Sequence, residues 1–227
     1  MTYSCFDVQI DNNIAHIILN RPEKRNSMVP AFWNELPKIV RDIDENSKAR
    51  VIVLSSTGPH FSSGLDVASF VEPEIADPAA KKAAEIQAGA NFYGAVKNMQ
   101  GTFTVLQECR LPVLAAVQGG CIGGGVDLIT ACDMRFATED AFITIFETNI
   151  GMTADVGTFP RITKLIADGL ARELAYTGRR MHADEGKTAG LFNNVYKDHE
   201  AMMAAVMKMA AEIASKAPLA IMGCKRM

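Results

Sequence analysis

The stretch that organises this chain reads LPVLAAVQGGCIGGGVDLITACDMRFAT and covers residues 111–138. Its apolar run Val113–Val117 follows a proline and predicts a buried strand. Five glycines lie within residues 119–125, and the apolar residues from Val126 onward predict a helix. A glycine-rich turn between a strand and a helix gathers free backbone N–H groups, which stabilise an anion or a developing oxyanion. The same glycines can instead form only a tight turn, since no complete phosphate-binding glycine motif is present.

Three carboxylates follow this turn: Asp127, Glu147 and Asp155. Taken alone, Asp127 fits the preference of helix N-termini for acids, and Glu147 fits a solvated loop. Asp155 stands between Ala154 and Val156 in an apolar neighbourhood, where an unpaired charge is costly to bury. The position of Asp155 is therefore the stronger indication of a functional acid.

Composition sets the limits on fold and function. The chain has 227 residues, of which 48% are apolar and 22% charged, enough for a sizeable globular core. A net charge of −3 argues against a general nucleic-acid or membrane-surface binder. The five cysteines lack zinc-site spacing, which predicts reduced thiols in an intracellular protein. No apolar run is long enough to predict a membrane span, and no secretory or peroxisomal signal is visible.

The rest of the chain alternates strand-like and helix-like segments. A second small-residue turn at 61–67 lies between a strand and a short helix, like the turn at 119–125. Residues 72–78 predict a polar, lid-like loop, and 79–109 a long helix. The other predicted strands cover residues 6–10, 14–19, 51–54, 135–137, 141–145 and 192–196. The other predicted helices begin at Pro30 or cover residues 162–166, 171–176, 183–190 and 199–216.

Several segments together resemble one family. They are Asn20-Arg21-Pro22 with Asn26, Phe61–Asp66, Gly123–Leu128, Ala131–Arg135 and Gly190–Val195. They occur in family order, so the chain resembles the enoyl-CoA hydratase/isomerase (crotonase) superfamily over nearly its whole length. The resemblance implies an α/β fold, a crotonase-like spiral of ββα repeats with helical C-terminal elements, assembled as a homotrimer or homohexamer. It implies a core at 1–195 and the start of the C-terminal helical region at 196–227, with the C-terminal end incomplete.

Within the superfamily, the acid pattern most resembles that of the Δ3,5-Δ2,4-dienoyl-CoA isomerases. Hydratases typically have glutamates at the positions of Asp127 and Glu147 and no acid at the position of Asp155. The resemblance implies an enzyme of fatty acid β-oxidation that converts 3,5-dienoyl-CoA to 2,4-dienoyl-CoA without a metal or other cofactor. Enoyl-CoA hydratase activity and a non-catalytic binding role stay open as alternatives. The compartment implied is the cytoplasm of a bacterium, or the mitochondrial or peroxisomal matrix of a eukaryote.

The resemblance also assigns roles. The backbone N–H groups of Leu65 and Gly124 would form an oxyanion hole for the thioester enolate. Glu147 would exchange a proton at C2 and Asp155 at C6, while Asp127 gives electrostatic support. The acyl-CoA would contact the loop Ser63, Gly64, Leu65, Asp66 and Val67, together with Gly124. Lys24 and Arg25 are candidates for phosphate contact, or else belong to a merely solvated basic loop.

Overall fold

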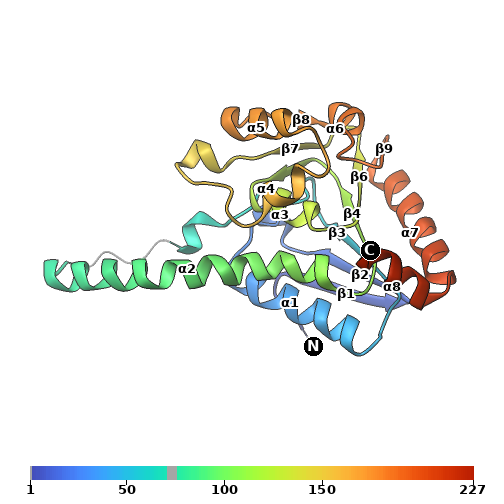
Figure 1. The fold of residues 1–227 in the computed structure, drawn as a ribbon, viewed down its shortest axis with the longest axis horizontal. Coiled ribbons are helices and arrows are strands. Elements are labelled where there is room, and N and C mark those ends of the chain that lie inside the picture. Colours follow the sequence, from blue (N-terminus) through green and yellow to red (C-terminus); the bar gives the residue numbers. More distant parts are fainter. Residues whose placement is uncertain (1, 71–75) are drawn as a thin grey trace.

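The structure is a computed structural model that describes residues 2–70 and 76–227 (Figure 1). Within these residues the main sheet has the strand order β1-β2-β3-β4-β6-β9, and a smaller sheet has the order β5-β7-β8. The main-sheet strands are β1 (Phe6–Asp11), β2 (Ile14–Leu19), β3 (Val51–Ser56), β4 (Val113–Val117), β6 (Met134–Thr138) and β9 (Asn194–Tyr196). The smaller sheet contains β5 (Gly120–Ile122), β7 (Phe142–Thr144) and β8 (Met181–His182). Apart from the antiparallel pair β1–β2, the main sheet is parallel.

Helices connect and cover these strands. The α-helices are α1 (Pro30–Glu45), α2 (Pro78–Glu108), α3 (Gly124–Thr130), α4 (Thr158–Ile162), α5 (Asp168–Thr177), α6 (Ala183–Ala189), α7 (His199–Ser215) and α8 (Pro218–Arg226). The described residues also form three short 3₁₀ helices, η1 (Pro22–Lys24), η2 (Val67–Phe70) and η3 (Glu147–Ile150). Figure 1 shows α1 and α2 in the lower part of the view and α7 along its right-hand edge.

The parallel strands are buried on both faces, and alternate side chains enter two different clusters. In β3, Ile52 and Leu54 join the large cluster that includes α1 and α2, whereas Val51 and Val53 join a smaller one. The smaller cluster is covered by α7, whose buried side chains recur every four residues, at Met202, Val206 and Ala210. Because strand side chains alternate with a period of two, an unbroken apolar run in the sequence supplies both cores.

The α/β fold class expected from the sequence is confirmed, but two local expectations were wrong. The glycine cluster is more than a turn, since residues 120–122 form β5 and α3 begins at Gly124. The helix expected at 162–166 lies earlier, at Thr158–Ile162, and residues 163–165 form turns. Ile162 and Ile166 are both buried, so their spacing shows which side chains enter the core and does not show that the helix continues to residue 166. The expected lid-like loop at 72–78 falls mostly on residues 71–75, which lie outside the described residues.

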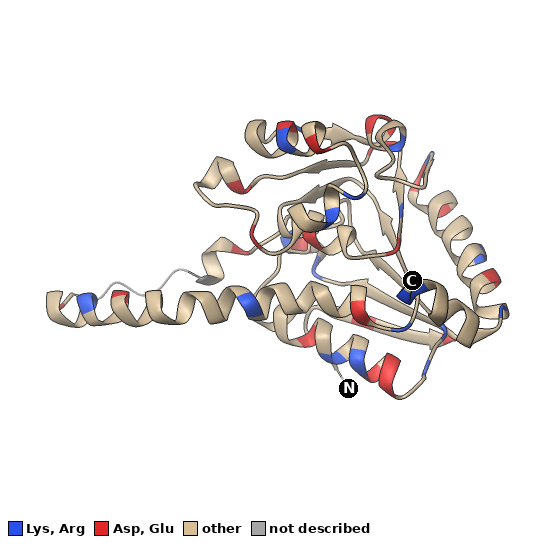
Figure 2. Ribbon diagram, viewed as in Figure 1, with Lys and Arg blue, Asp and Glu red and all other residues tan. Residues whose placement is uncertain are grey.

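The helix α2 has two unlike halves. Its C-terminal half is buried from Thr102 to Leu106, whereas its N-terminal half extends beyond the body of the molecule (Figure 1). The exposed half includes Phe92 and Tyr93, and residues 86–96 carry no charged side chain (Figure 2). No helix in the described part of the chain is long and apolar enough to cross a membrane.

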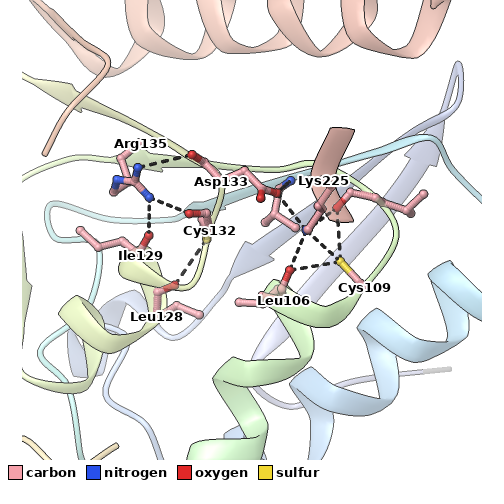
Figure 3. A network of polar contacts seen from close by, with 10 residues as sticks. Leu106, Cys109, Leu128, Ile129, Cys132, Asp133, Arg135 and Lys225 are labelled. Atoms are coloured by element: carbon pink, nitrogen blue, oxygen red, sulfur yellow. Dashed lines mark hydrogen bonds and ion pairs between the residues drawn. The ribbon is translucent and has the colours of Figure 1, made fainter. Parts of the chain in front are cut away.

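The last helix, α8, is held by one buried cation (Figure 3). Lys225 Nζ donates hydrogen bonds to the carbonyls of Leu106, at 2.8 Å, and Leu111, at 2.6 Å. It also forms an ion pair with Asp133 at 2.9 Å, and its side chain is only 6% exposed. Asp133 in turn accepts a hydrogen bond from the Val113 N–H. Lys225 therefore joins α8 to the end of α2 and to the start of β4.

We expect Lys225→Met to lower the free energy of unfolding by about 2–4 kcal/mol, because buried carbonyls lose their donor. Lys216→Met is the matched control, since Lys216 forms an exposed 3.5 Å ion pair with Glu212. Its loss should cost about 0.5 kcal/mol or less. Urea unfolding of both variants measures the difference, and equal effects would show that the Lys225 contacts do not stabilise the fold.

Candidate active site

Two turns meet where the acids gather. Leu65 lies opposite Met28 in an isolated parallel bridge. The Met28 N–H donates to the Gly64 carbonyl at 2.8 Å, and the Asp66 N–H donates to the Met28 carbonyl at 3.1 Å. Because neighbouring residues of a strand direct their N–H groups to opposite sides, the Leu65 N–H points away from Met28.

Glycine allows the second turn to approach the first. Gly64 has a φ of +78°, and a Cβ placed on it would lie 2.6 Å from the Ile122 carbonyl oxygen and 3.1 Å from Gly124 N. Gly124 is the first residue of α3, so its N–H has no intrahelical acceptor. Neither the Leu65 N–H nor the Gly124 N–H donates a hydrogen bond to any residue that the structure describes. Two free donors thus lie on adjacent turns.

A buried asparagine fixes the turn that contains Leu65. Asn26 Nδ2 donates to the carbonyls of Thr57, at 2.9 Å, and His60, at 3.0 Å. The Ser62 hydroxyl donates to the Asn26 carbonyl and accepts from the Gly64 N–H. These hydrogen bonds join the 20–26 segment, which was noticed in the sequence only through the family resemblance, to the 61–66 turn.

The other residues expected to contact CoA lie along the same segments. The Ser63 N–H donates to the Arg25 carbonyl at 2.9 Å, which places this turn beside the exposed side chains of Lys24 and Arg25. The Asp66 carboxylate accepts from the Ser27 hydroxyl at 2.8 Å, and this hydrogen bond lowers the pKa of Asp66. Val67 begins η2 and is 52% exposed.

Asp127 is the most deeply buried of the three acids, with 1% of its surface exposed. The Thr158 hydroxyl donates to its Oδ1 at 2.8 Å. Its Oδ2 is buried and has no hydrogen-bond partner among residues 2–70 and 76–227. Burial raises the pKa of Asp127 to about 7, the Thr158 hydrogen bond opposes this shift, and the charge of Glu147 adds to it.

Glu147 lies at the start of η3 and faces the glycine turn. A Cβ on Gly123 would lie 3.1 Å from Glu147 Oε1, so this glycine, at a φ of +51°, leaves room for the carboxylate. Burial raises the pKa of Glu147, backbone hydrogen bonds lower it, and the charge of Asp155 raises it. The charge of Glu147 therefore acts on Asp127, and the charge of Asp155 acts on Glu147.

Asp155 is half-buried and lines a cavity of about 260 Å³. The cavity is lined by Gln100, Thr104, Ala154, Asp155, Val156, Gly157, Pro160 and Arg161. Gln100 of α2 donates to the Asp155 carbonyl at 2.6 Å, which fixes the backbone of this segment. Of the three acids, only Asp155 lies in this cavity wall.

Two residues of α4 were missed in the sequence. Thr158 bonds Asp127, and Arg161 lies near it as a buried cation. The expected helix at 162–166 began too late to include either of them. The signal available was their spacing of three residues, which places both on one face of a helix.

The donor set does not indicate a metal centre. In the described ranges no group of three or more His, Cys, Asp or Glu side chains is arranged to hold a metal ion. The cysteines there are free, and Cys5, Cys109, Cys121 and Cys132 are buried.

Asp127 should make stability depend on pH. Its folded pKa, about 7, lies above its ordinary value of 3.8, so the stability present at acidic pH is lost as pH rises toward 7. Asp127→Asn lacks this titration. Its free energy of unfolding, relative to that of the wild type, should therefore rise by about 2–3 kcal/mol between pH 5 and pH 8. Urea unfolding at the two pH values checks this.

Thr158→Val should act in the opposite direction. It removes the donor that favours ionised Asp127, so the loss of stability between pH 5 and pH 8 should become larger. A pH dependence that is the same in the wild type and both variants would contradict the burial of a titrating Asp127.

Comparison with known proteins identifies the family. The family model for enoyl-CoA hydratase/isomerase matches residues 9–227. Over 214 residues the chain is 44% identical to the mitochondrial Δ3,5-Δ2,4-dienoyl-CoA isomerase of Mus musculus, covering 94% of this chain and 64% of that protein. It is 38% identical to the peroxisomal Δ3,5-Δ2,4-dienoyl-CoA isomerase of Arabidopsis thaliana, covering 95% of this chain and 77% of that protein. The chain thus spans just under two thirds of its mouse relative.

The fold agrees with a solved structure. A Thermobifida fusca protein described as a candidate enoyl-CoA hydratase, crystallised with CoA, superposes with a TM-score of 0.84 at 28% identity. The superposition covers 98% of this chain and 83% of that one. The resemblance drawn from the sequence motifs is confirmed at this level, and the chain belongs to the enoyl-CoA hydratase/isomerase family.

Proposed function

We propose that this chain isomerises 3,5-dienoyl-CoA to 2,4-dienoyl-CoA in fatty acid β-oxidation. The observation that carries the proposal is the set of three interacting acids beside two free backbone donors. A plain hydration site needs fewer carboxylates than the three gathered here. The names of the mouse and Arabidopsis relatives support the same reaction.

The thioester carbonyl would bind between the Leu65 and Gly124 N–H groups. Removal of a proton from C2 puts negative charge on this oxygen, and each donor directed at it is worth roughly 3–4 kcal/mol in comparable sites. Both donors are fixed by the fold before substrate binds, because the Met28 bridge and the glycine contact set their direction. No side chain has to reorganise to form this oxyanion hole.

The proton transfer would divide between two acids. Glu147 removes a proton from C2, the C2=C3 bond forms as the electrons of the diene move along the chain, and Asp155 delivers a proton to C6. The burial that raises the pKa of Glu147 makes it a better base than an exposed carboxylate. Asp127, which is farther from solvent, would support Glu147 electrostatically. The step leaves the oxidation state unchanged and as proposed requires no cofactor.

The CoA portion would lie along Ser63–Val67, with Lys24 and Arg25 at its phosphates. The CoA complex of the Thermobifida relative supports a CoA thioester as the ligand. A trimeric or hexameric assembly, and the division into a core at 1–195 and a C-terminal helical region from 196, stay predictions. A mitochondrial or peroxisomal location is suggested by the names of the relatives.

The assay that tests the function follows absorbance with two substrates, 3,5-dienoyl-CoA and 2-enoyl-CoA. The proposal expects the conjugated 2,4-diene to appear from the first substrate. Asp155→Asn should lower that turnover by about 10²–10⁴-fold, because the amide cannot exchange a proton. Binding of the CoA thioester should be nearly unchanged, since the oxyanion donors and the CoA loop are untouched.

Two results would contradict this function. Hydration of 2-enoyl-CoA without any diene shift would favour the hydratase alternative. Wild-type turnover in Asp155→Asn would mean that the third acid has no part in the reaction. Loss of activity together with loss of thioester binding would indicate damage to the fold, which circular dichroism detects.

The phosphate contact has a separate test. Replacing Lys24 and Arg25 together by alanine should weaken CoA binding by about tenfold, and less at high salt, because exposed charge pairs are weak and screened. Lys216→Ala is the control, since Lys216 directly follows α7 and forms an exposed ion pair with Glu212. Isothermal titration with CoA at two salt concentrations measures both. Equal affinities for the double variant and the control would place these basic side chains outside the ligand site.

A further inference from the structure

One buried cation lies near Asp127, and neither the sequence motifs nor the proposed proton transfers use it. Arg161 of α4 is 9% exposed. Its Nε donates to Gln107 Oε1 at 3.2 Å, and its Nη2 donates to Thr104 Oγ1 at 3.0 Å, both on α2. Its Nη1 is buried without a hydrogen-bond partner in the described part of the chain.

The chain is shaped to admit this guanidinium. Gly157 has a φ of +125°, and a Cβ on it would overlap Arg161 Nη1. Any side chain at residue 157 would therefore occupy the position of the guanidinium. Because Gly157 lies two residues after Asp155, the segment that carries this acid also makes room for the cation.

Arg161 and Asp127 are unsatisfied in complementary ways. Asp127 Oδ2 is a buried acceptor without a partner, and Arg161 Nη1 is a buried donor without one. Thr158, one turn before Arg161 on the same helix, holds the other carboxylate oxygen at 2.8 Å. Arg161 and Asp127 do not form an ion pair with each other in the described part of the chain. Their charges nevertheless interact, since Arg161 lowers the pKa of Asp127 and Asp127 raises that of Arg161.

The hydrogen bonds from Thr158 favour ionised Asp127, whereas the other groups that face it, apart from Arg161, oppose its charge or are uncharged. Glu147, from η3, repels it. The Cys121 thiol, from β5, is fully buried, and burial raises its pKa well above the ordinary value, so it is uncharged near neutral pH. Burial and the charge of Glu147 raise the pKa of Asp127. Among the described residues that influence Asp127, Arg161 is the cation whose charge lowers this pKa.

We infer that Arg161 is a positioning residue whose buried charge favours the ionised form of Asp127 beside Glu147. The catalytic meaning of this role rests on the proposed function, because an ionised Asp127 increases the proton affinity of Glu147, the base assigned to C2. The same side chain also connects α4 to the Asp155 segment through α2. Thr104, which holds Nη2, donates to the Gln100 carbonyl, and Gln100 donates to the Asp155 carbonyl.

The test titrates the Asp127 carboxyl directly. Protein labelled with ¹³C at the aspartate carboxyls is followed by NMR over pH, and Asp127→Asn identifies the resonance. Arg161→Gln should raise the Asp127 midpoint by about one pH unit or more, a tenfold change in proton affinity. Arg161→Lys keeps the charge and should leave the midpoint within a few tenths of the wild type. A folded Arg161→Gln with an unmoved midpoint would overturn the inference.

A surface variant decides the question if Arg161→Gln does not fold. Gln107 is exposed, so Gln107→Glu should fold, and its carboxylate would pair with Arg161 Nε. That pairing should raise the Asp127 midpoint. Thr104→Val is the matched control, since it removes one hydrogen bond from the guanidinium but no charge, and it should leave the midpoint in place. A shift in Thr104→Val as large as in Gln107→Glu would make the role of Arg161 purely structural.

Activity provides the second readout. The acidic limb of the kcat–pH profile should move to higher pH in Arg161→Gln, and this movement should vanish in an Asp127→Asn background. A uniform loss of kcat at every pH would contradict a role through Asp127. The NMR titration needs no substrate, so a chain without isomerase activity would contradict the proposed function while the titration still decides the role of Arg161.

Discussion

The structure depends on the close approach of two backbone turns, one after β3 and one after β4. These strands are neighbours in a parallel sheet, so their carboxyl ends open on the same edge. The turns can touch only because Gly64 has no side chain, and the distance of 3.1 Å from its would-be Cβ to Gly124 N leaves no room for one. This contact brings two free N–H groups together at the first residue of α3, the helix that carries Asp127. The site therefore follows from sheet topology together with one missing side chain.

The acids beside this contact are costly to the fold. Burial raises the pKa values of Asp127 and Glu147, which means that their ionised forms are less stable than they would be in water. The chain offsets this cost with a large apolar core on one face of the sheet and the cluster under α7 on the other. It also surrounds Asp127 with a hydroxyl donor and a cation from a single short helix. Shifted pKa values of this kind are concentrated at functional sites of proteins.

The helix α2 connects the site to the periphery. Its buried half carries Thr104 and, near the surface, Gln107, which hold Arg161, while Gln100 holds the backbone of Asp155. The end of α2 is fixed in turn by Lys225 of α8 (Figure 3). The acid-bearing segment and the C-terminal helix are thus coupled through one rigid element, although they are far apart in sequence.

The sequence by itself determined the elements with strong local signals. Val113–Val117 was predicted with its observed bounds because a buried parallel strand is continuously apolar. The helix that opens at Ala183 was predicted to end at Gly190 because glycine is common at helix C-termini, and in the structure Gly190 adopts the left-handed conformation there. The family, the two glycine turns and the three acids were also visible there. Only the tertiary structure decided that Thr158 and Arg161 serve Asp127, that Lys225 anchors α8 and that β5 lies inside the glycine cluster. Each of these depends on partners that are distant in the sequence. The role of a polar residue is fixed only when folding determines which buried group it contacts.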